Sequence, residues 1–107
     1  MDTLRIGLMG YGRWAREAYT PVLLEREDVR VVAVSERSDE TLAAARASFG
    51  SEIATHRDFA GLADDPNVDA VMIAVPTRLH LPALEAAMRA GQHVFAEPPL
   101  GFDAHEI

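Results

Sequence analysis

Short apolar runs alternate with amphipathic segments along the whole sequence, and this alternation constrains the fold more than any other feature. The apolar runs, each interpreted as a strand, are LRIGLM (4–9), VRVVAVS (29–35), IATH (53–56), DAVMIAVP (69–76) and QHVFAE (92–97). Helical spacing is predicted between them over 13–26, 39–49, 58–63 and 79–90. Such alternation requires right-handed crossovers and a parallel sheet. We therefore predict an α/β fold, a Rossmann-like doubly wound sheet with helices on both faces, that ends after about the fifth strand.

The first helical segment contains an internal irregularity. Its spacing directs Trp14, Ala18 and Val22, together with Ala15, toward the core. Pro21 lies inside this segment and has no N–H to donate, so it should kink the helix or weaken one turn.

Composition excludes several classes of protein. The 107 residues suffice for one domain, 1–107, and no apolar run approaches the roughly 20 residues of a membrane helix. The net charge of −7 and scattered arginines argue against a nucleic-acid surface. The absence of cysteine removes thiol nucleophiles and thiolate metal sites. We expect a cytoplasmic protein with no membrane or nucleic-acid partner and no metal. His56, His93 and His105 are interpreted as structural or solvated, and Asp64 and Asp65 as a solvated turn.

The segment GYGRWA, residues 10–15, follows a predicted strand and opens a predicted helix. It matches the G-x-G-x-x-G/A dinucleotide fingerprint, in which the glycines allow a tight turn and close approach of a pyrophosphate to the helix N-terminus. We favour cofactor binding over a purely structural turn. Trp14 is also interpreted as a core or cleft-edge residue. The candidate loop residues are Gly10, Tyr11, Gly12, Arg13 and Trp14.

Two further groups of residues follow predicted strands. Glu36 ends the second strand, where an acidic residue hydrogen-bonds the adenosine ribose and favours NAD, while the adjacent Arg37 keeps NADP open. The alternative is that ERSDE is only a solvated loop and helix cap. Pro76, Thr77 and His80 follow the strand over 69–76, where ligands of a doubly wound sheet lie. His80 could equally be a histidine packed at a helix N-terminus.

Together these blocks resemble the glucose-fructose oxidoreductase / inositol dehydrogenase / MocA (Gfo/Idh/MocA) family of NAD(P)-dependent oxidoreductases. The resemblance covers essentially the whole chain and rests on RIGLMGYG, VVAVSER, PNVDAVMIAVPTRLH and ALEAAMRAGQHVFAEPPL. It implies an N-terminal cofactor domain, a C-terminal α+β domain for substrate and oligomer contacts, and hydride transfer with a sugar, polyol or related alcohol. It also implies that Thr77, His80 and Glu97 line the nicotinamide side.

The sequence departs from the family at one chemically important position. Glu97 and Pro99 match the ends of the family's Glu-Lys-Pro motif, but Pro98 stands where the family has the lysine that assists proton transfer. The family's second domain is also expected to be absent from 1–107. We therefore expect cofactor binding without turnover, with His80 as the remaining catalytic candidate and a sugar- or polyol-like substrate only if a second domain exists. A non-catalytic dinucleotide sensor and an inactive fragment remain as alternatives. Exposed apolar surface predicts a homo-oligomer.

Overall fold

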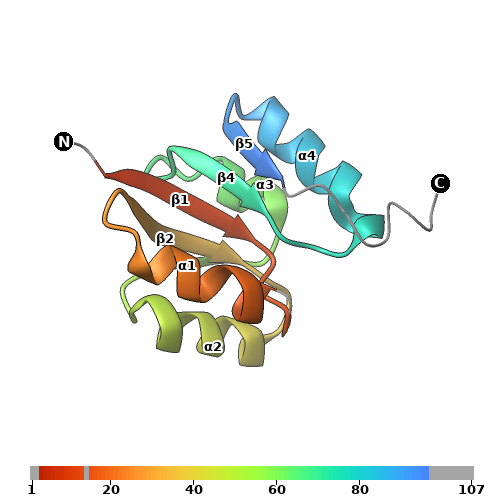
Figure 1. Cartoon of the computed structure of the whole chain (residues 1–107). Coiled ribbons are helices and arrows are strands. Elements are labelled where there is room, and N and C mark those ends of the chain that lie inside the picture. Colours follow the sequence, from red (N-terminus) through yellow and green to blue (C-terminus); the bar gives the residue numbers. More distant parts are fainter. Residues whose placement is uncertain (1–2, 14, 97–107) are drawn as a thin grey trace.

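A computed structural model describes residues 3–13 and 15–96, which form a parallel sheet flanked by helices (Figure 1). The strands are β1 (Leu4–Met9), β2 (Val29–Ser35), β3 (Ala54–His56), β4 (Ala70–Ile73) and β5 (His93–Ala96). Their order is β3-β2-β1-β4-β5, and every neighbouring pair is parallel. The predicted Rossmann-like α/β fold is therefore confirmed, with β3 at one edge of the sheet.

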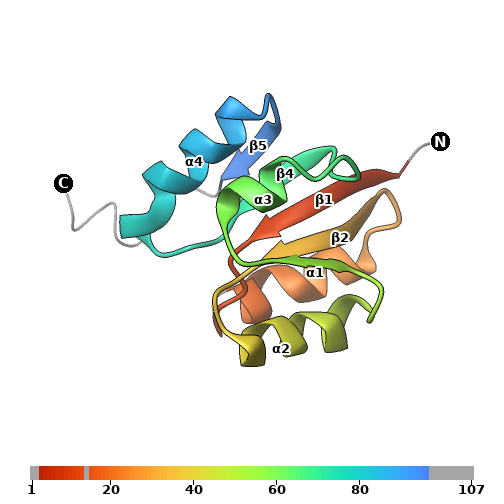
Figure 2. The same ribbon diagram turned by 180° about the vertical axis from the view of Figure 1, so that it is seen from behind.

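Helices cover both faces of the sheet and make three layers. A π-helical turn (Ala15–Tyr19) runs directly into α1 (Thr20–Glu25), and α2 (Asp39–Phe49) lies beside it on the same face (Figure 1). The opposite face carries α3 (Phe59–Ala63) and α4 (His80–Arg89), the latter preceded by a 3₁₀ turn (Thr77–Leu79) (Figure 2). Each face has its own core. One contains Leu8, Val34, Leu42 and Ala45, and the other contains Met9, Leu62, Val71 and Ala83.

Local capping signals set the helix ends. Ser38 Oγ accepts the N–H of Thr41 at 3.0 Å and starts α2. Asp58 Oδ1 accepts the N–H of Gly61 at 2.7 Å and starts α3. Gly50, at a φ of 110°, ends α2. These bonds satisfy N–H and C=O groups that a helix leaves unpaired at its ends, which is why the sequence predicts these boundaries well.

The first helix differs from the prediction in the face that it buries. Val22 was predicted to face the core but is 55% exposed, and the buried positions are Ala15, Thr20 and Leu23. The cause is the π-helical turn, because an i→i+5 turn contains one more residue than an α-helical turn and shifts every later side chain by one position. Pro21 accompanies this change, since it has no N–H with which to close an α-helical bond.

Strand β4 is shorter than the predicted 69–76. Ala74 still donates its N–H to Met9 O at 2.8 Å, but the chain then leaves the sheet. The carbonyl of Pro76 accepts the N–H of Leu79 at 2.8 Å and closes the 3₁₀ turn. The chain therefore turns at the carboxyl edge of the sheet, where ligands of this fold lie.

Candidate cofactor site

The predicted site residues within the described ranges gather at the carboxyl end of the sheet. The glycine turn follows β1, Glu36 follows β2, and Pro76 to His80 follow β4. β2 and β4 both pair with β1, so the three connections leave the sheet side by side. Trp14, Glu97 and Pro98 lie outside the described residues.

Gly10 is a glycine because the fold requires it. Its φ is +94°, and a Cβ atom would lie 2.7 Å from both Ala74 O and Val75 Cγ1. Its N–H donates to Ser35 O at 3.0 Å, which ties the turn to the end of β2. Any side chain here would collide with the β4 connection and adopt a conformation that L-residues disfavour.

Gly12 differs from Gly10, because the conformation and packing of the described residues do not require a glycine at position 12. Its φ lies outside the left-handed region, and among the described residues, its two chain neighbours aside, no heavy atom lies within 4 Å of the position that a Cβ would occupy. Its carbonyl accepts the N–H of Arg16 at 3.0 Å, which begins the helical ladder. Within residues 3–13 and 15–96, no other segment packs against this side of Gly12 at the entrance to the helix. A glycine without an internal requirement is what close approach of a pyrophosphate would explain.

The side chain of Tyr11 points into the core, whereas that of Arg13 points to the surface. The Tyr11 ring is fully buried, and its hydroxyl bonds to Ser48 Oγ at 2.7 Å and Thr20 Oγ1 at 3.0 Å. Arg13 is exposed and pairs with Glu17 at 2.8 Å across one helical turn. Only the backbone of Tyr11 is therefore available to a ligand, whereas the Arg13 guanidinium stands at the surface beside the turn.

Glu36 joins the glycine turn to the next connection. Its Oε2 accepts the N–H of Tyr11 at 2.6 Å, and its Oε1 accepts the N–H of Arg37 at 3.2 Å. The Glu36 N–H donates to His56 O at 3.0 Å, so the end of β3 supports the same position. A carboxylate has about four lone-pair sites, so Glu36 keeps acceptor capacity for ribose hydroxyls while holding the turn.

The loop after Glu36 is braced from β3. Arg57 donates to Arg37 O at 2.7 Å and also pairs with the Asp39 carboxylate. The guanidinium of Arg57 is thereby engaged, and Glu36 and Asp39 place two carboxylates at this corner. These contacts could not be predicted from the sequence, since Arg57 lies in a segment without a motif.

The segment after β4 contributes Pro76, Thr77 and His80. Pro76 is exposed, Thr77 opens the 3₁₀ turn, and His80 is the first residue of α4 and partly buried. The backbone thus brings all three to the same end of the sheet as the glycine turn. Within residues 3–13 and 15–96, no group of three His, Asp or Glu side chains is arranged to hold a metal ion. No helix in that part of the chain is long and apolar enough to cross a membrane.

Asp65 differs from the sequence prediction. Asp65 was interpreted as a solvated turn residue, but its side chain is 8% exposed and bonds through Oδ2 to His56 Nε2 at 2.9 Å. Burial raises the pKa of the Asp65 carboxyl, but the hydrogen bonds from Asn67 N–H and His56, with the charges of His56 and Arg5, outweigh it. The pKa of Asp65 therefore lies below its ordinary value. His56, interpreted from the sequence as structural or solvated, thus has a partner that the sequence does not reveal.

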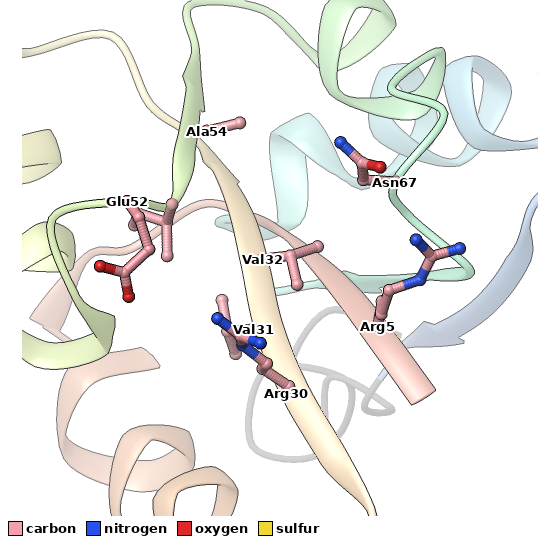
Figure 3. A pocket seen from close by; sticks show the side chains of 8 residues that line it. Arg5, Arg30, Val31, Val32, Glu52, Ala54 and Asn67 are labelled. Atoms are coloured by element: carbon pink, nitrogen blue, oxygen red, sulfur yellow. The ribbon is translucent and has the colours of Figure 1, made fainter. Parts of the chain in front are cut away.

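A hollow of about 250 Å³ lies elsewhere on the molecule. Figure 3 shows its lining side chains, which come from the amino-terminal halves of β1 and β2, from the start of β3 and from the loop before β4. They include Arg5, Arg30 and Asn67. Since the strands are parallel, this hollow is at the opposite end of the sheet from the glycine turn.

Comparison with known proteins supplies the family. The model of the family described as "Oxidoreductase family, NAD-binding Rossmann fold" (GFO_IDH_MocA) matches residues 4–107. A dTDP-3,4-didehydro-2,6-dideoxy-alpha-D-glucose 3-reductase of Streptomyces antibioticus is 38% identical over 97 residues, covering 91% of this chain and 29% of the reductase.

Two solved structures show the same fold with cofactor bound. Scyllo-inositol dehydrogenase from Lactobacillus casei, with NAD(H) and scyllo-inositol, has a TM-score of 0.81 at 30% identity. The match covers 94% of this chain and 29% of the dehydrogenase chain. KijD10, a 3-ketoreductase from Actinomadura kijaniata with NADP and TDP-benzene, has a TM-score of 0.82 at 29% identity. The match covers 92% of this chain and 30% of KijD10. This chain spans less than a third of the length of each of these relatives. It belongs to the Gfo/Idh/MocA family of oxidoreductases and corresponds to that family's NAD-binding Rossmann domain.

Proposed function

We propose that this chain binds NAD with the pyrophosphate over Gly10 to Ala15 and the adenosine ribose at Glu36. The observation that carries the proposal is Gly12, which neither its φ nor the described residues around it require to be glycine. The free N-terminal amides of the helix would face the pyrophosphate, and the partial positive charge there favours an anion. Pro76, Thr77 and His80 would flank the nicotinamide end.

Glu36 supports NAD over NADP. A carboxylate accepts hydrogen bonds from ribose hydroxyls but repels a 2′-phosphate. Arg57, which could have neutralised a phosphate, is instead paired with the nearby Asp39 carboxylate. Arg37 is the opposing feature, because its guanidinium has no ion-pair partner among the described residues. Since the Asp39–Arg57 pair carries no net charge, Glu36 stands against Arg37, and the position of Glu36 directly after β2 favours NAD.

The chemistry of the longer relatives supports hydride transfer with a sugar or polyol. Bound NAD would accept or supply the hydride, while protein groups bind, orient and exchange a proton with the substrate hydroxyl. The resemblance assigns that proton to a lysine, and Pro98 at this position has no ionisable group. Residues 1–107 would therefore bind the cofactor without turning over a substrate.

Titration of NADH fluorescence with the wild-type chain and Gly12→Ala tests the proposal. Apart from its chain neighbours, the added methyl group meets no atom of the described residues within 4 Å, so the variant should fold normally. It should nevertheless obstruct the pyrophosphate and raise the Kd for NADH by about tenfold or more, equivalent to about 1.4 kcal/mol. Gly12→Asp should weaken binding further by adding charge repulsion. Equal binding by all three proteins would refute the assignment.

Pro98 favours a second candidate function, a non-catalytic dinucleotide sensor whose cofactor binding alters association with a partner. Such a role needs no proton-transfer lysine. A longer protein that contains this chain should be assayed with NAD and a panel of polyols, beside its Pro98→Lys variant. Turnover by the unaltered protein would exclude the sensor role, and turnover only in the lysine variant would support it.

A further inference from the structure

We propose that Tyr11 is a positioning residue that fixes the pyrophosphate-binding turn from inside the core. This inference rests on the proposed function, because it concerns how the same site is kept ready for its ligand. Tyr11 stands between the two glycines of the motif, and its aromatic ring is 0% exposed. It therefore acts on a ligand only through the backbone that it holds.

The phenol of Tyr11 joins the turn to two helices. Its hydroxyl lies 2.7 Å from Ser48 Oγ on α2 and 3.0 Å from Thr20 Oγ1 at the start of α1. Thr20 Oγ1 also donates to Ala15 O at 3.3 Å, within the π-helical turn. The ring meets Phe49 edge to face, with centroids 5.5 Å apart and planes at 66°. One side chain thus fixes the turn relative to both helices on this face.

The main chain of Tyr11 is held as firmly as its side chain. Its N–H donates to Glu36 at 2.6 Å, and the preceding N–H, of Gly10, donates to Ser35 O at 3.0 Å. Gly10 and Gly12 have no side chains with which to anchor themselves, and the side chain of Arg13 is exposed. Tyr11 is therefore the side chain that anchors the described part of the turn, residues 10–13, in the core.

A turn that is ordered before binding loses less conformational entropy when the ligand arrives. Removing the Tyr11 hydroxyl should loosen the turn, because the ring keeps its packing but loses both hydroxyl partners. The affinity should therefore decrease for ligands whose pyrophosphate the turn contacts. Adenosine has no phosphate and should be affected little.

The decisive variants are Tyr11→Phe, Ser48→Ala and their combination. We expect Tyr11→Phe to raise the Kd for NADH and for ADP by about three- to tenfold, with the Kd for adenosine changed by less than about twofold. Ser48→Ala should have a smaller effect in the same direction. The double variant should bind no more weakly than Tyr11→Phe, because both substitutions remove the same hydrogen bond.

A matched control separates positioning from general stability. Leu62→Val truncates a fully buried side chain in the other core, on α3, and should lower the unfolding free energy without changing the Kd for NADH. A wild-type Kd in Tyr11→Phe, an equal loss for adenosine, or an equal loss in Leu62→Val would overturn the inference. Failure of the wild-type chain to bind NADH would instead refute the proposed function.

Discussion

The main-chain N–H of Tyr11 donates to Oε2 of Glu36 at 2.6 Å, across 25 residues of sequence. The glycine turn after β1 and the carboxylate after β2 are therefore one hydrogen-bonded unit. Because the Glu36 N–H also donates to His56 O, the unit extends to the end of β3. Glu36 is thus both the proposed ribose acceptor and part of the support for the turn.

This double role predicts a specific result for Glu36→Ala. Loss of the carboxylate removes the ribose acceptor and one support of the turn, so the Kd for NADH should rise by about tenfold, since hydrogen bonds to charged groups contribute about 1.5–3 kcal/mol. Loss of negative charge should at the same time reduce discrimination against NADPH. Fluorescence titration with both cofactors measures the ratio of the Kd for NADPH to the Kd for NADH. The exposed Glu40→Ala is the control for net charge. An unchanged ratio would exclude Glu36 as the selector.

Elements set by local signals were predicted closely from the sequence. The bounds 4–9, 29–35 and 39–49 coincide with β1, β2 and α2, because apolar periodicity and capping residues are encoded within each segment. The segments that carry the candidate site residues also leave the sheet at one end, as expected, since parallel strands bring their carboxyl ends together.

Features that depend on contacts between distant segments were not predicted. The partners of Tyr11 lie 9 and 37 residues away, and no local pattern links them. The one-residue shift that exposes Val22 arises from the π-helical turn, although Pro21 signalled an irregularity. Burial of Asp65 depends on His56, whose ring reaches it from β3.

Gly7 of β1 and Gly12 of the turn should respond oppositely to substitution by alanine. At Gly7, a Cβ would lie 2.9 Å from Leu62 Cδ2 and 3.0 Å from Val68 Cγ1, so these two buried side chains would have to shift. Gly7→Ala should lower the unfolding free energy by about 1–3 kcal/mol. Gly12→Ala should leave it unchanged or raise it by up to about 1 kcal/mol, because it reduces the entropy of the unfolded chain. Urea denaturation measures both, and comparable destabilisation would contradict the open space at Gly12.

The Asp65 carboxyl should make stability depend on pH in the acid range. The pKa of Asp65 in the folded protein lies below its value in the unfolded chain. At pH values between these two pKa values, the unfolded state therefore binds more protons than the folded state. Its contribution is fully present above the ordinary carboxyl pKa of about 4, and is lost as the pH falls through the depressed value. The unfolding free energy is measured by urea denaturation at a series of pH values. Asp65→Asn should flatten its acid part, whereas Asp64→Asn, at an exposed position, should not. Parallel profiles for wild type and Asp65→Asn would rule out this contribution.

Exposed apolar side chains on β5 and α4 predict self-association of the chain. Phe95 is 49% exposed, and Leu81 and Met88 of α4 are 64% and 66% exposed. Val94 packs into the core beneath α4, so its neighbour Phe95 faces the opposite side of the sheet, where α1 and α2 lie over other strands (Figure 1). Light scattering should show a mass that increases with concentration, because burial of such surface contributes about 25 cal/mol per Å².

Phe95→Ser should reduce that association more than Leu24→Ser, which removes an equally exposed side chain, 58%, from α1. The comparison distinguishes contact through the sheet face at β5 from general stickiness of apolar surface. Equal reductions would place the contact elsewhere. A constant monomer mass for the wild-type chain at millimolar concentration would show that these side chains do not drive association.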